Sequence, residues 1–102
     1  MTMLNYISCF FAGAFFANVV PHFVHGISGD PFPTPFANPP GKGLSSPTVN
    51  VVWSLVNLVA GYLLFRAGHL AVGSPLALLV LLAGIAAISL PMSVHFREKH
   101  AR

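Results

Sequence analysis

Charge and cysteine are what this sequence has least of. Among its 102 residues are five Lys or Arg, two Asp or Glu and one cysteine, whereas 55% are hydrophobic. About a quarter of the residues of a soluble domain are charged, so these few charges could not cover a water-exposed surface. Low charge combined with high hydrophobicity excludes intrinsic disorder. Cys9 has no partner within the sequence, which excludes a disulfide-stapled scaffold. The remaining class is an integral membrane protein.

Three stretches without Lys, Arg, Asp or Glu define the membrane crossings. They are residues 1–29, 43–65 and 67–96. Roughly 20 mainly apolar residues in a helix span the hydrocarbon core, so each stretch is long enough for one crossing and too short for two. Backbone groups in lipid must bond to one another, so each crossing is a helix. The sequence therefore predicts an all-α integral membrane protein, a single membrane domain with three transmembrane helices. We place these helices at about residues 3–25, 47–66 and 75–95, followed by a basic tail at 96–102.

A serine followed by a proline marks the predicted start of the second and third helices. The pairs are Ser46-Pro47 and Ser74-Pro75. A serine side chain caps the first free N–H groups of a helix, and proline suits the first helical position because it has no N–H. The link from Arg66 to Ser74 is short, so we expect the second and third helices to be antiparallel neighbours.

The first helix is expected to stay in the mature chain. A cleaved signal peptide at residues 1–20 is the alternative. However, this segment has no Lys or Arg, and its apolar stretch is longer than the usual core of a signal peptide. We therefore count it as a transmembrane helix.

The segment between the first two helices, residues 26–46, contains five prolines and four glycines. That composition precludes a regular helix. The segment also carries Phe32 and Phe36 and only one charge of each sign, unlike a disordered polar loop. Proline has no N–H to satisfy and so tolerates a dry setting. We predict that this loop caps the inner mouth of the helices with Phe32 and Phe36 as plugs. The alternative is that it docks into a partner subunit.

The distribution of basic residues predicts the orientation. Three crossings put only Arg66 on the side of the N-terminus, and they put Lys42, Arg97, Lys99 and Arg102 on the other side. Basic residues favour the cytoplasm. We predict an N-terminus outside and a C-terminus in the cytoplasm, with the lipid bilayer as the first partner. Four dispersed cations form no basic stripe, so the sequence does not indicate nucleic-acid binding.

Polar residues repeat along one face of the second helix. Asn50, Ser54, Asn57 and Gly61 are spaced i, i+4, i+7 and i+11, which places them on one face. An amide exposed to lipid in mid-span would be costly. We therefore predict that this stripe, together with Asn18 of the first helix, serves helix packing. Packing within one protomer, a polar oligomer interface and a substrate path are the three alternatives. Trp53, towards the helix end, is typical of an interfacial aromatic residue.

Histidines are the only candidates for site chemistry. His22 and His25 lie at the inner end of the first helix, and His95 lies at the inner end of the third. Imidazole is the commonest metal ligand; three could hold zinc and two could ligate a haem iron. A compact motif such as H-E-x-x-H is absent. The alternatives are a structural or interfacial role, including a hydrogen bond to a loop carbonyl, and a proton relay. The sequence shows no nucleophile–base pair, so we predict no catalytic residue.

One part of the chain resembles a known family. Residues 18–53 are similar to a family of small, uncharacterised bacterial inner-membrane proteins. The resemblance depends on Asn18, Pro21-His22-Phe23, Gly26, the Pro-Phe pairs, Pro39-Pro40-Gly41 and Gly43-Leu44-Ser45-Ser46. It implies a bacterial inner membrane and no particular activity.

Three functional hypotheses follow from the sequence. The first is a non-enzymatic membrane protein, an accessory subunit or a homo-oligomer assembled through helix packing. The second is a metal- or haem-binding protein that uses His22, His25 and His95. The third is a small oligomeric transporter or channel, against which stands the lack of a carboxylate in the predicted spans. The sequence leaves the cofactor unknown.

Overall fold

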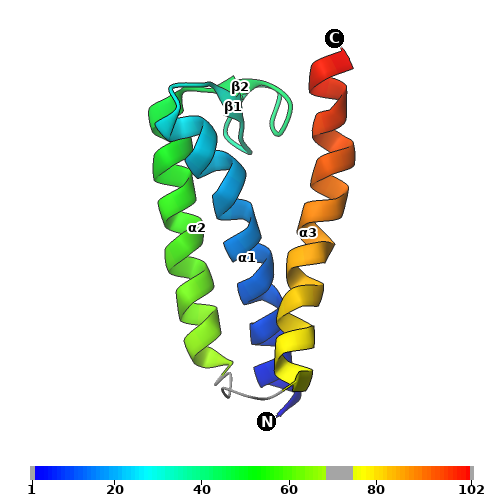
Figure 1. The fold of residues 1–102 in the computed structure, drawn as a ribbon. Helices are drawn as coiled ribbons and strands as arrows, with labels where there is room; N and C mark the ends of the chain where they lie inside the picture. The colour runs from blue at the N-terminus through cyan, green and yellow to red at the C-terminus, as the bar shows by residue number, and fades with distance from the viewer. Residues whose placement is uncertain (1, 69–74, 102) are drawn as a thin grey trace.

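The computed structural model describes residues 2–68 and 75–101, with side chains as far as Arg97. It contains three long helices, α1 (Met3–Ile27), α2 (Pro47–Ala67) and α3 (Pro75–Ala101), shown in Figure 1. All three are long and apolar enough to cross a membrane. The predicted all-α architecture with three spans is confirmed. Pro21 and Pro91 lie inside α1 and α3 without ending them.

Capping residues explain where the first two helices begin. The Thr2 hydroxyl accepts a hydrogen bond from the Asn5 N–H, and the Asn5 side chain accepts one from the Thr2 N–H. The Ser46 hydroxyl accepts from the Val49 N–H at 3.2 Å. Each cap satisfies N–H groups that the first helical turn leaves unpaired. The cap predicted at Ser74 lies outside the described residues.

Helix α1 lies between the other two helices and packs against both (Figure 1). Over the described residues, α2 and α3 make no comparable contact with each other. The expectation that the second and third helices would be neighbours is therefore wrong. A short link fixes which membrane face two helices share, but the packing surfaces decide which helix each one touches. Here α1 offers a packing surface on two sides.

On one side, α1 and α3 approach so closely that their backbones touch. A Cβ atom built on Gly84 would run into the Phe10 carbonyl oxygen, and one built on Gly13 would run into the Leu81 carbonyl oxygen. Small residues permit this approach in membrane helices, where van der Waals contact drives association. The pair Gly13 and Gly84 therefore fixes where α3 meets α1.

On the other side, α1 and α2 meet through the predicted polar stripe. Asn50, Ser54, Asn57 and Gly61 are the buried residues of α2. Asn18 Nδ2 of α1 donates to Asn57 Oδ1 at 3.0 Å, and Asn57 Nδ2 donates to a carbonyl of its own helix. A Cβ on Gly61 would lie 2.7 Å from the ring of Phe16 on α1. The stripe is thus used for packing inside one protomer, and it is not available to a second chain.

The loop between α1 and α2 forms a small hairpin over one end of the bundle (Figure 1). Strand β1 (Phe32–Pro33) pairs antiparallel with β2 (Leu44–Ser45), with Phe32 opposite Ser45 and Pro33 opposite Leu44. The hairpin lies at the same end as the C-terminus of α3, and the N-terminus lies at the opposite end (Figure 1). The predicted position of the proline- and glycine-rich loop is confirmed.

We predict that Gly84→Ala destabilises the protein. Alanine has the higher helix propensity by about 1 kcal/mol, but its Cβ would collide with the Phe10 carbonyl. Overpacking of this kind costs about 1–3 kcal/mol, so the unfolding midpoint in an SDS titration should fall. Ala83→Leu, at an exposed position of α3, is the control and should leave the midpoint unchanged. An equal or higher midpoint for Gly84→Ala would contradict the close approach.

Candidate functional site

A buried amide joins both ends of the loop to two helices. Asn50 on α2 is fully buried. Its Oδ1 lies 2.7 Å from His22 Nδ1 of α1. Its Nδ2 lies within hydrogen-bond distance of the carbonyls of Phe32 (3.0 Å), Ser45 (3.2 Å) and Ser46 (3.0 Å). One side chain therefore holds α1, the start of α2 and both strands of the hairpin.

The same amide fixes the tautomer of His22. Because Asn50 Nδ2 is occupied in donating to carbonyls, Asn50 Oδ1 is the acceptor and His22 Nδ1 donates. In the neutral ring, Nε2 then carries a lone pair. No described residue donates to this nitrogen. The ring is only 3% exposed and stands edge-on to Phe32 (5.4 Å) and to Trp53 (6.5 Å between centroids). The tautomer and the plane of His22 are both set by its neighbours.

The far side of the loop is tied within itself and to α3. The hydroxyls of Thr34 and Ser45 lie 2.6 Å apart across the hairpin. The Gly41 N–H donates to the Thr34 carbonyl at 2.8 Å. His95 Nε2 of α3 donates to the Gly41 carbonyl, also at 2.8 Å. The loop is therefore a structured cap that contacts all three helices.

The two predicted aromatic plugs have different positions. Phe32 is 5% exposed, stacks on His25 at 4.3 Å and contacts Phe96 at 4.8 Å. Phe36 is 66% exposed and has one edge contact, with Trp53 at 4.9 Å. Phe32 lies in β1, which Asn50 holds against the helices, whereas Phe36 lies in the following turn at the surface. Only Phe32 is enclosed.

The three histidines proposed as metal ligands have separate partners. His22 binds Asn50, and His95 binds a loop carbonyl. His25 stacks on Phe32, with its Nδ1 4.0 Å from an Asp30 oxygen. Within the described ranges, no group of three or more His, Cys, Asp or Glu side chains could hold a metal ion. All three histidines instead make contacts that help to hold the loop against the helices.

A cavity of about 270 Å³ lies beneath the hairpin, and we call it the loop cavity. All three helices and the loop line it. Its lining comprises Asn18, His22, Pro33, Thr34, Pro35, Gly41, Trp53, Ile88, Pro91, Met92, His95 and Phe96. It is mostly apolar with a few polar groups, as ligand sites usually are.

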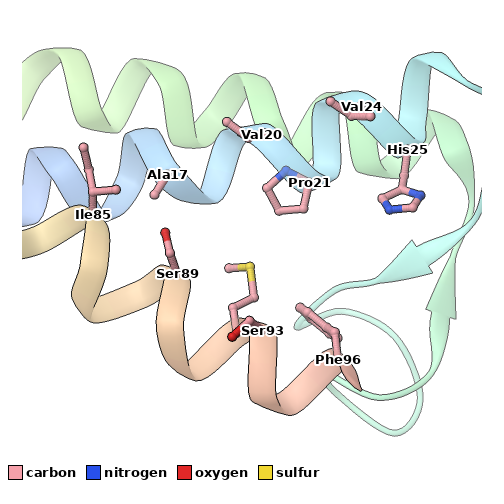
Figure 2. A pocket seen from close by; sticks show the side chains of 10 residues that line it. Ala17, Val20, Pro21, Val24, His25, Ile85, Ser89, Ser93 and Phe96 are labelled. Atoms are coloured by element: carbon pink, nitrogen blue, oxygen red, sulfur yellow. The ribbon is translucent and has the colours of Figure 1, made fainter. Parts of the chain in front are cut away.

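A second hollow of about 520 Å³ lies between α1 and α3, and we call it the lateral groove. Figure 2 shows the side chains of Ala17, Val20 and Val24 from α1 on one side and those of Ile85, Ser89 and Phe96 from α3 on the other. Met92 and Phe96 line both the groove and the loop cavity. The two hollows therefore share a wall on α3.

Trp53 is the site residue that sequence reasoning missed. Its indole lines the loop cavity, and its Nε1–H is buried without a hydrogen-bond partner in the part of the chain that the structure describes. A buried N–H without a partner is rare in native structures and calls for an explanation. The available clue was its position three residues after Asn50, which places the two side chains on neighbouring parts of one helix face.

No family model, curated protein or solved structure matches this chain. The resemblance of residues 18–53 to small bacterial inner-membrane proteins stays a prediction. A fold alone does not define a function. The loop, the loop cavity and the lateral groove are therefore the features that bear on the function of this chain.

We predict that Asn50→Leu releases the loop. The substitution leaves His22 Nδ1 without its acceptor and removes a donor from the carbonyls of Phe32, Ser45 and Ser46. Loss of a buried partner of this kind costs about 1–3 kcal/mol. Residues 31–45 should then lose protection in hydrogen exchange and become sensitive to protease.

Asn57→Leu is the matched control, because it removes a buried amide of the same stripe that makes no contact with the loop. It should lower the overall stability of the protomer and leave loop protection intact. Equal loop protection in the two variants would contradict the role given to Asn50.

Proposed function

We propose that this chain is a non-enzymatic subunit of a bacterial inner membrane, either an accessory subunit of a larger complex or a homo-oligomer, which docks through the lateral groove. The observation that supports this most is the groove itself, an apolar hollow of about 520 Å³ within the membrane-spanning part of two helices. The protein contacts the bilayer through its three spans.

The groove exists because α3 meets α1 closely at one end only. The close approach lies at Gly13 and Gly84, and α3 diverges from α1 towards the hairpin end (Figure 1). Val20 and Val24 are left exposed on α1 beside this gap. A side chain from another membrane helix would gain contacts there that the protomer does not make for itself, which is the main source of helix association in lipid.

The buried polar groups of the protomer support a structural role over a catalytic one. Asn50, Ser54, Asn57 and Thr34 are buried, and each is hydrogen-bonded within the protein. An oligomer interface was one of the three alternatives that the sequence left open for the stripe on α2. Since that stripe faces α1, we assign assembly to the groove on the other side of α1.

We predict that Val20→Phe weakens assembly. The added ring would fill the groove from α1, where Val20 is 59% exposed. Steric overpacking of about 1–3 kcal/mol corresponds to a loss of roughly fivefold to 150-fold in association. Native mass spectrometry of protein released from its own membrane should show the complex lost in favour of the free chain.

Val59→Phe is the control, because Val59 is 58% exposed on α2 and lies outside the groove. Its spectrum should match the wild type. Equal effects of the two variants, or a wild-type chain that is always alone, would refute docking through the groove. The mass of the complex distinguishes copies of this chain from a different partner.

The proposed orientation has the N-terminus outside and the C-terminus in the cytoplasm. Lys42 and Arg97 lie at the hairpin end of the bundle, and Arg66 lies at the other end. We predict that green fluorescent protein fused after the C-terminus fluoresces and that alkaline phosphatase fused there is inactive. The opposite pair of results would refute the orientation. Replacing Arg97 and Lys99 with Gln should increase the misoriented fraction, because the charge bias decides orientation.

A further inference from the structure

We propose that the loop cavity binds an uncharged amphiphile whose head carries a hydroxyl group, with that hydroxyl donating to His22 Nε2. This proposal does not depend on docking through the lateral groove. The two hollows share Met92 and Phe96 of α3, but His22, Asn18 and Trp53 line the loop cavity and not the groove, and Val20 lines the groove and not the loop cavity. Three features of the cavity support the proposal: the acceptors in its wall, the buried indole N–H of Trp53 and the absence of charged side chains among the described residues that line it.

The cavity is larger than a hydration site. Its volume is about 270 Å³, whereas one water molecule takes roughly 30 Å³ of liquid. The loop roofs it with Pro33 and Pro35, and Ile88 and Met92 of α3 form an apolar wall. A head group of several heavy atoms fits beneath the hairpin, and an attached chain can follow α3 towards the hydrocarbon.

Two acceptors in the wall lack donors. The first is His22 Nε2, because Nδ1 is the nitrogen that donates to Asn50. The second is Asn18 Oδ1. Asn57 Nδ2 donates to the Trp53 carbonyl, so Asn57 Oδ1 is the acceptor for Asn18 Nδ2. That orientation leaves Asn18 Oδ1 without a donor among the described residues. An occupant that donates hydrogen bonds suits this wall.

Trp53 has an indole N–H that needs a hydrogen-bond acceptor. Its indole lines the cavity, and its buried Nε1–H has no acceptor among the residues described. A hydroxyl is both donor and acceptor. One hydroxyl oxygen could therefore donate to His22 and accept from Trp53 once the indole turns towards it. A ketone or an ether could serve only Trp53.

The lining also indicates a neutral head. No Lys, Arg, Asp or Glu is among the described residues that line the cavity. Burying an ion without a counter-charge is costly, whereas a hydroxyl that finds hydrogen-bond partners is not. A fatty alcohol or a phenol with an alkyl chain has the required combination of neutral head and apolar tail.

Trp53 is the only tryptophan in the sequence, so all tryptophan fluorescence comes from the wall of the loop cavity. Trp53 also lines a hollow beside Val49 and Val52 of α2, and variants that fill the loop cavity distinguish the two places. The probe is a long-chain primary alcohol with bromine on the carbon next to the hydroxyl carbon, added to the full-length protein in lipid nanodiscs. We expect saturable quenching by the alcohol. The methyl ether of the same compound enters the bilayer equally but cannot donate a hydrogen bond, so it should give only weak quenching without saturation.

Variants separate cavity binding from quenching by bulk lipid. Ile88→Phe fills the cavity and leaves both residues of the His22–Asn50 pair in the chain, and it should abolish saturable quenching. Leu90→Phe, at an exposed position of the same helix, should behave like the wild type. His22→Phe keeps an aromatic ring and removes both the acceptor in the cavity and the donor to Asn50. Half-saturation should rise roughly threefold to tenfold, and hydrogen exchange of residues 31–45 in the same variant reports whether the loop is still in place.

Three results would each overturn the proposal. They are equal quenching by the alcohol and its ether, saturable quenching that persists in Ile88→Phe, and tighter saturation by the corresponding brominated carboxylate. Val20→Phe should lose assembly and keep quenching, so failure of the docking hypothesis and failure of this site can be told apart.

Discussion

The hydrogen-bonded pair of Asn50 and His22 is the interaction on which the rest of this structure depends. The proline- and glycine-rich segment has little regular backbone pairing of its own, only the two short strands β1 and β2, yet it lies at the end of a bundle of membrane-spanning helices. One buried amide accepts from the end of α1 and donates to carbonyls at both strands of the hairpin. The loop is thereby held as a roof, and the space beneath it becomes a defined cavity. The same hydrogen bond orients His22 in the cavity wall, so one contact both holds the loop and positions the candidate binding residue.

Helix α1 packs against its two neighbours, α2 and α3, through different kinds of contact. Towards α2 the helices are joined by amide hydrogen bonds and by an aromatic ring seated on Gly61. Towards α3 they are joined by backbone contact at Gly13 and Gly84. The contacts at Asn50, Asn57 and Gly61 extend along much of α2, whereas the glycine contact with α3 is local. The bundle is therefore closed on one side and partly open on the other, and the groove and the loop cavity both border α3.

Much of the fold could be predicted from the sequence, because the distribution of charge and the spacing of polar residues determine it. The positions of Lys and Arg predict the three spans, and the spacing of Asn50, Ser54, Asn57 and Gly61 predicts the polar stripe on α2. The central position of α1 was not accessible, since link length says nothing about which surfaces are complementary. The separate partners of His22, His25 and His95 could not be predicted for a related reason. Membrane depth can be deduced from sequence, but the partner of each ring depends on where an amide such as Asn50 points. Trp53 was overlooked because an aromatic residue near a helix end has a ready interfacial explanation.

The residues that hydrogen-bond with Asn50 all lie in one continuous stretch of the sequence, and this affects how the protein can fold during synthesis. All of them lie between His22 and Asn50. The unit of α1, hairpin and α2 can thus be completed while α3 is still being synthesised. When α3 enters the bilayer it meets a finished surface, with Gly13 already presented to Gly84. Helix α3 then adds its close approach to α1 at Gly84, the hydrogen bond from His95 to the Gly41 carbonyl and the contact of Phe96 with Phe32. The order of translation is therefore also an order in which the interfaces can close.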